Sequence, residues 1–378
     1  EGLYPVMGHH DRPLRGYETK VVALADRLSA GERLYVEEEQ PEQLLSIFCS
    51  ITVEQGGEEL KVPENLYWPL QPLHLDRKAL FPEKKLETGQ IPAAYSLLWK
   101  SFEGEIKNLL EAHQKGGNLS VYLESLLLLL QRYTWCVPSA YYRAMPDVSL
   151  YDHSRITAAL AVCLLDRDEA ILDEILRALE KWGRGAQVPE VLQRQEIALL
   201  VGGDISGVQD FIYTITARGA TSALRGRSFY LQLLTEAVAR YTIRRLGLPA
   251  TNLLYQGGGG FYLLARPADR ENLENIRKEV SRILLAHHRG DLYLALTWVP
   301  LVAADFYDGR ISGRWEELGG RLQKAKQSRF VELKEELADL FKPEGYGGTE
   351  EKECKVCSRE HPDTREEAGV RKCPPCLS

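Results

Sequence analysis

The sequence has no long apolar run, no secretory signal and no excess of positive charge. The longest apolar stretch, residues 119–130, is interrupted by Glu124, and a membrane span needs about 18 apolar residues. We therefore expect a cytoplasmic chain without a membrane partner. The net charge of −7 argues against general polyanion coating but permits local basic faces. With 44% hydrophobic and 27% charged residues, wholesale disorder is excluded.

Both ends of the sequence indicate a piece of a larger protein. The chain opens on Glu1 rather than on Met, and it stops two residues after its last cysteine.

Four of the seven cysteines form two C-x-x-C pairs near the end of the chain: Cys354, Cys357, Cys373 and Cys376. Two such turns can direct four thiolates at one ion, which predicts a closed, structural zinc site rather than a catalytic one. The alternative is four unrelated reduced cysteines. His361 could replace one sulfur, although four cysteines suffice. The scattered Cys49, Cys136 and Cys163 have apolar neighbours and are expected in cores.

The periodicity divides the chain into four segments. Residues 1–85 combine a helix at 17–29, a strand at 44–53 and proline-rich loops, and residues 86–195 are a helical connector that ends in a linker at 183–189. Residues 196–345 read β-α-β-β-α-β, which predicts an α+β, ferredoxin-like domain. Its expected elements are 197–201, 208–215, 228–246, 252–255, 261–265, 270–287 and 292–299, followed by a helix over 314–340. Residues 342–353, rich in glycine and glutamate, are a linker into the cysteine cluster, and the last segment, residues 346–378, holds the zinc cysteines.

The first strand of the β-α-β-β-α-β segment ends in Asp204 and Ser206, and Gly257–Gly260 join its second and third strands. Palm and cyclase domains with this plan hold a metal–triphosphate group with two carboxylates, one after the first strand and one at the hairpin. This hairpin offers no acid, so the segment is not a self-sufficient catalyst. Alternatively, Asp204 and Ser206 only cap the next helix, and the glycines only make a hairpin.

Arginines accumulate between residues 211 and 250, where Glu236 is the one glutamate. Arg225 and Arg227 precede a predicted helix, and a guanidinium pair at a helix start could hold RNA backbone or a nucleotide phosphate. A solvated helix face is the alternative.

Several segments resemble the large subunit of type III-A (Csm) CRISPR effector complexes. Those similar to its first Palm domain are Gly203–Tyr213 (GDISGVQDFIY), Leu224–Leu231 (LRGRSFYL) and Tyr255–Gly259 (YQGGG). Gly8–His10 with Ala25–Arg33 (ADRLSAGER) resembles the later half of its HD nuclease domain, and Pro146–His153 (PDVSLYDH) the segment leading to the Palm. The zinc cysteines also lie where that family places a zinc module.

The resemblance implies a subunit with two activities. In the family the HD domain is a metal-dependent single-strand DNA nuclease, and two Palm domains make cyclic oligoadenylate from ATP with magnesium or manganese when target RNA pairs with guide RNA. It implies His10, Asp26 and, less directly, His9 as ligands of a transition metal. It implies Asp204, Ser206, Gly257, Gly258 and Gly259 as nucleotide-cleft residues. The family's first His-Asp pair and its Gly-Gly-Asp-Asp hairpin are not in this sequence.

Two other functions remain open. One is a stand-alone nucleotide cyclase, against which the missing hairpin acid argues. The other is a zinc-ribbon RNA-binding scaffold with an inert palm. Asp152 and His153 could form a further metal pair, but we interpret them as a helix start, with Asp152 near the N-cap.

Overall fold

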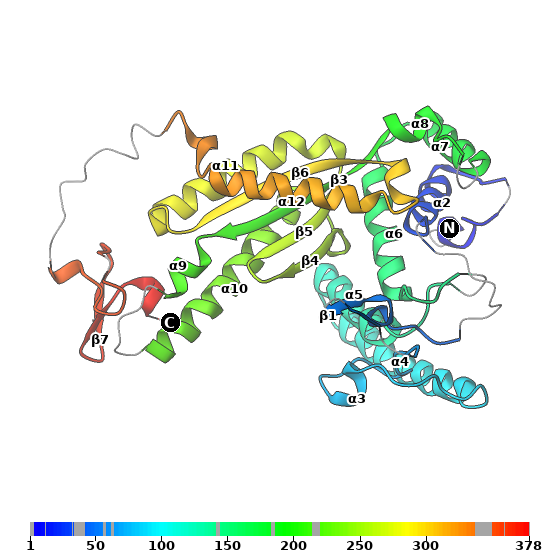
Figure 1. Cartoon of the computed structure of the whole chain (residues 1–378), viewed down its shortest axis with the longest axis horizontal. Helices are drawn as coiled ribbons and strands as arrows, with labels where there is room; N and C mark the ends of the chain where they lie inside the picture. Colours follow the sequence, from blue (N-terminus) through cyan, green and yellow to red (C-terminus); the bar gives the residue numbers. More distant parts are fainter. Residues whose placement is uncertain are drawn as a thin grey trace. The chain divides into compact units, whose positions relative to one another are not determined.

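The computed structural model describes the chain except for residues 1–3, 12, 32, 34–41, 56–57, 62–63, 141–143, 183–185, 214–219, 337–349, 359 and 378. The chain divides into two compact units (Figure 1). One comprises residues 1–161, 167–177 and 306–309, and the other residues 162–166, 178–305 and 310–378. Of the predicted linkers at 183–189 and 342–353, residues 183–185 and 342–349 lie outside the described residues. Within the described part, no helix is long and apolar enough to cross a membrane.

The first unit is mainly helical. Its elements are α1 (Tyr4–Met7), α2 (Tyr17–Ser29), the 3-10 helix η1 (Ile47–Ser50), β1 (Thr52–Gln55), β2 (Glu58–Lys61), α3 (Arg77–Leu80), α4 (Ile91–Gln114) and α5 (Leu119–Thr134), with the beginnings of α6 (Leu150–Leu164) and α7 (Glu169–Lys181). Helix α2 has the predicted bounds because Val21, Leu24, Ala25 and Leu28 recur on one buried face.

The strand predicted for residues 44–53 is wrong. One isolated bridge joins Leu45 to Tyr67, and the chain then forms η1. The Ser46 hydroxyl accepts a hydrogen bond from the Phe48 amide at 3.4 Å, which favours the tight helical turn over an extended backbone. The strand β1 begins only at Thr52 and pairs antiparallel with β2.

The second unit is built on a four-stranded antiparallel sheet. Its elements are α8 (Glu190–Arg194), β3 (Glu196–Ser206), α9 (Val208–Tyr213), α10 (Ala220–Arg245), η2 (Ala250–Asn252), β4 (Leu253–Gly257), β5 (Gly260–Ala265), η3 (Pro267–Asp269), α11 (Arg270–His288), β6 (Tyr293–Val302), η4 (Ala303–Phe306), α12 (Ile311–Gln327), η5 (Val331–Leu333), η6 (Glu350–Lys352), β7 (Arg365–Glu367), β8 (Val370–Lys372) and η7 (Pro374–Cys376). The strand order is β4-β5-β3-β6. The mixed helix-and-sheet class and the β-α-β-β-α-β order from 196 to 302 agree with the sequence.

Residues of β3 alternate between the two faces of this sheet. Leu199, Val201 and Ile205 join a buried cluster with side chains of α10 and α11. On the opposite face, the space beside Gly202 is filled by side chains of α12. Asp204 shares the α12 face, because its carboxylate pairs with a lysine of that helix.

Two predicted helix bounds require correction. The helix predicted from Ser228 begins at Ala220, so Arg225 and Gly226 lie inside α10 rather than before it. The helix predicted for residues 314–340 ends at Gln327, because Phe330 adopts a left-handed backbone with φ of 60°. Cys136 and Cys163 are buried as expected, whereas Cys49 is half-buried.

Candidate functional site

Three candidate ligands converge in the first unit. Side-chain ligand atoms of His9, His10 and Asp26 lie within 4.8 Å of one another. The Nδ1 atom of His9 donates a hydrogen bond to the Val6 carbonyl oxygen, which leaves Nε2 as the ring nitrogen that could face a metal. A backbone partner on one ring nitrogen is the usual way in which proteins orient a metal-binding histidine. The sequence assigned these three residues to a metal site, and the fold brings them together.

His153 of α6 completes this cluster. Its Nε2 lies 3.0 Å from Asp26 Oδ1, and its Nδ1 lies 3.0 Å from the Ser29 hydroxyl. Burial raises the pKa of Asp26. The hydrogen bond and charge of His153 and the charges of His9 and His10 lower it by more in total, so the net pKa is below its usual value. Asp26 is therefore held as a carboxylate, which is the form that binds cations.

The sequence placed His153 correctly on a helix but missed its contact with Asp26. Asp152 lies in the first turn of α6, near the N-cap as predicted. Ser149, not Asp152, caps α6, because its hydroxyl accepts a hydrogen bond from the Asp152 amide at 3.0 Å and donates one to the Asp152 carboxylate at 2.7 Å. No local sequence signal joins His153 to a residue 127 positions away.

In the second unit, Asp204 is paired with a cation. The Lys326 ammonium of α12 lies 2.6 Å from Asp204 Oδ2, and both side chains are partly exposed. Asp204 also lies opposite Gly260 in the β3–β5 register, which places it beside the glycine hairpin. A single carboxylate that already neutralises a lysine is a poor ligand for a pair of divalent ions.

The predicted nucleotide residues lie close to each other at this end of the sheet. The Ile205 amide donates to the Gly259 carbonyl at 2.9 Å, which joins the hairpin tip to the backbone just before Ser206. Gly258 and Gly259 both have positive φ, 60° and 88°, as a two-residue hairpin turn requires. The chain after Ser206 turns at Gly207, where φ is 92° and a Cβ would overlap the Asp291 carbonyl oxygen. The turn therefore admits only glycine.

The four C-x-x-C cysteines form one buried group. Their sulfur atoms lie within 4.8 Å of one another, and each side chain is at most 5% exposed. Hydrogen bonds from the other thiols lower the pKa of Cys354, whereas interactions with their neighbours raise the pKa values of Cys373 and Cys376. A divalent ion that binds four thiolates fits this set of four buried sulfur donors.

Arg227 does not fit its predicted contact with RNA phosphate. Its side chain is buried, with 1% exposure, and its guanidinium donates to Cys376 Sγ at 3.0 Å and to the Phe211 carbonyl oxygen. Arg225, two residues earlier on α10, is exposed. The predicted arginine pair is therefore split, because one helical residue points into the protein and the other to solvent.

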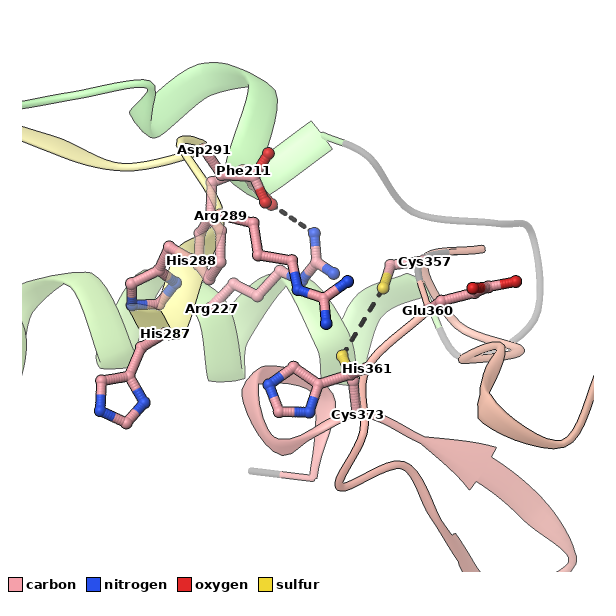
Figure 2. Close-up of a pocket in the computed structure, with 10 residues that line it drawn as sticks. All are labelled: Phe211, Arg227, His287, His288, Arg289, Asp291, Cys357, Glu360, His361 and Cys373. Atoms are coloured by element: carbon pink, nitrogen blue, oxygen red, sulfur yellow. Dashed lines mark hydrogen bonds between the residues drawn. The ribbon is translucent and has the colours of Figure 1, made fainter. Parts of the chain in front are cut away.

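A cavity of about 40 Å³ lies beside Arg227 (Figure 2). Its lining from the sheet side is Phe211, Arg227, His287, His288, Arg289 and Asp291, and its lining from the cysteine segment is Cys357, Glu360, His361 and Cys373. His361 is not among the four grouped sulfur donors, and its Nδ1 instead accepts a hydrogen bond from the Asp363 amide at 3.1 Å.

Comparisons with known proteins agree with these features. The family model of Csm1 subunit domain B matches residues 197–343. A curated relative from Methanocaldococcus jannaschii, the CRISPR system single-strand-specific deoxyribonuclease Cas10/Csm1 (subtype III-A), is 32% identical over 403 residues, which cover 94% of this chain and 46% of the relative. The chain thus spans about half the length of that relative.

Solved structures give the same result. The apo Csm1–Csm4 cassette matches with a TM-score of 0.60 and 25% identity over 85% of this chain and 38% of that chain. The cassette in complex with cA4 matches with a TM-score of 0.54 and 27% identity over the same shares. Fold and sequence therefore make this chain similar to proteins of CRISPR systems. More narrowly, it is similar to Csm1 of subtype III-A over 94% of its length, and residues 197–343 match Csm1 subunit domain B.

Proposed function

We propose that this chain belongs to a large subunit that cuts single-stranded DNA at a metal site and contributes half of a site for making cyclic oligoadenylate. Its partners are then guide RNA, target RNA and the other subunits of a cytoplasmic type III-A complex. The convergence of His9, His10 and Asp26, with His153 behind the carboxylate, carries the nuclease part of this proposal. The printed name of the M. jannaschii relative supports it.

The proposed nuclease chemistry follows from the donor set. Two imidazoles and one carboxylate suit a divalent transition metal, which supplies activated water when it is bound. Asp26 contributes a carboxylate oxygen, and His153 fixes its orientation through Oδ1. His9 contributes Nε2, because Nδ1 is occupied by the Val6 carbonyl.

Manganese binding tests this site directly. Paramagnetic resonance titration of the chain should show at least a tenfold weaker manganese affinity for Asp26→Asn, because the charged ligand is lost. Glu18→Gln is the matched control, since Glu18 is an exposed acid on the same helix. Unchanged affinity in Asp26→Asn would contradict the assignment.

For the sheet unit, we propose a ferredoxin-like Palm that binds ATP jointly with a second Palm. Asp204, Ser206 and Gly257–Gly259 line its half of the cleft, and the likeness to a cassette solved with cA4, a cyclic oligoadenylate, supports this role. The division proposed from the sequence is a partial HD domain at 1–85, a helical connector at 86–195, this Palm at 196–345 and a zinc-binding segment at 346–378.

We infer that this chain alone makes no cyclic oligoadenylate. The Lys326 ammonium pairs with the Asp204 carboxylate beside the hairpin, and the sequence has no acid at residues 256–261. Incubation with ATP and either magnesium or manganese, followed by chromatography, should therefore yield no cyclic product. Robust product formation by this chain would refute the argument and favour a stand-alone cyclase.

The four cysteines complete the proposal as a structural zinc site. Four buried sulfur donors leave no coordination position for water, so the metal would stabilise the segment rather than catalyse a reaction. Elemental analysis should find about one zinc per chain. The RNA-binding scaffold is less well supported, because Arg227 is buried against Cys376.

A further inference from the structure

Arg227 is the largest fully buried side chain among the described residues, and it carries a full positive charge. Its contacts include two acceptors and one aromatic face. One nitrogen donates to Cys376 Sγ at 3.0 Å, another donates to the Phe211 carbonyl, and the guanidinium carbon lies 5.0 Å from the centre of the Phe211 ring.

A buried guanidinium needs a compensating negative charge, because removing an ion from water costs several kcal/mol of free energy. A well-placed ion pair can offset that cost. A carbonyl oxygen and a ring face carry only partial charges. Among these contacts, the atom that can carry a full negative charge is Cys376 Sγ, as a thiolate 3.0 Å from the guanidinium nitrogen.

Four thiolates around one divalent cation supply that charge. The centre then carries a net charge of −2, whereas four neutral thiols carry none. Arg227 and the metal site thus depend on each other: the metal keeps Cys376 ionised, and the ionised sulfur makes burial of Arg227 favourable. This dependence is reciprocal, because anything that favours one partner must favour the other by the same free energy.

We propose that Arg227 is a positioning residue for the metal–thiolate centre, which it partly neutralises and attaches to the sheet unit. The inference rests on the proposed metal site. Its contacts connect the centre to α9, since Phe211 is in that helix and the Phe211 amide bonds to the Gly207 carbonyl at 2.9 Å. Metal loading therefore stabilises the turn that follows Ser206, some distance along the chain from the cysteines.

Two variants and one control test the proposal on the 378-residue chain. Arg227→Met removes the charge but keeps an unbranched side chain, and Arg227→Lys keeps the charge but has a single donor group. Arg225→Met is the matched control, because Arg225 is exposed on the same helix. Zinc affinity is measured by competition with a chromophoric chelator. We expect about 10- to 100-fold weaker binding for Arg227→Met, partial rescue in Arg227→Lys and no change for Arg225→Met.

A second measurement uses the wild-type chain, in case Arg227→Met does not fold. Removing zinc with a chelator should increase amide hydrogen exchange in peptides covering 208–213 and 225–231, and re-addition should reverse it. Peptides covering 253–265, in β4 and β5, should not change.

The outcomes separate the two proposals. A wild-type chain without zinc would refute the metal site. Zinc in the wild type together with wild-type affinity in Arg227→Met would refute the role of Arg227 and leave the metal site standing. Unchanged exchange at 208–213 after zinc removal would refute the connection to α9.

Discussion

Gly207 should be the most sensitive glycine in the sheet unit. It has φ of 92°, and a Cβ built on it would overlap the backbone carbonyl oxygen of Asp291. A left-handed backbone costs an alanine about 1–2 kcal/mol, and overpacking against atoms that cannot rotate away adds about 1–3 kcal/mol. The reduced entropy of the unfolded chain returns about 0.4–1 kcal/mol. Gly207→Ala should thus lower the free energy of unfolding by about 1–4.6 kcal/mol.

Gly258→Ala is the matched control for that variant. Gly258 also has positive φ, 60°, but nothing lies within 4 Å of its would-be Cβ. Only the backbone strain remains, so the expected loss is at most about 1.6 kcal/mol. The free energy of unfolding of both variants is measured by urea titration, with hydrogen exchange of β3 and β6 as the signal for this unit. Equal losses in the two variants would refute the reasoning, because the steric overlap distinguishes them.

Two further predictions concern stability. Burial raises the pKa of Glu317, but Arg314 and Arg321 lower it more, so its net pKa is below 4.5. A carboxyl group whose pKa is lower in the folded state stabilises the fold above its unfolded pKa, and this stabilisation is lost as the pH falls through the folded pKa. Glu317→Gln should therefore lower the free energy of unfolding at pH 7 and match the wild type in strong acid. Urea titrations from pH 7 to pH 3 measure this, and an equal loss at all pH values would contradict it. Ser149→Ala should remove the cap of α6 and lower the free energy of unfolding by about 0.5–2 kcal/mol. Thermal unfolding measures this loss, and Ser120→Ala, in the exposed first turn of α5, is the control. Equal losses in the two variants would argue against the cap.

Local periodicity predicted most of the secondary structure, because each element carries its own apolar pattern. The helix at 17–29 and the order of strands from 196 to 302 follow from such patterns. The start of α10 was missed because Gly226 indicates a break, yet the helix continues through it. Residues 44–53 have β-branched composition, but Ser46 stabilises a helical turn there.

The candidate sites were predictable only where their chemistry lies in short motifs. The spacing of the two C-x-x-C pairs is by itself enough to predict a metal site. The roles of His153 and Arg227 could not be found in this way, because their partners lie 127 and 149 residues away. The sequence around a helical arginine does not show whether its side chain faces solvent or a sulfur atom. Only the packing of α10 distinguishes Arg225 from Arg227.

The contact between Asp26 and His153 limits how far the chain can be shortened around the candidate metal site. The two residues belong to α2 and α6, which share a compact unit that extends to residue 161. A fragment ending at residue 85 would retain all three candidate ligands but lose the imidazole that holds the carboxylate. A fragment made to test the proposed nuclease site should therefore extend past α6.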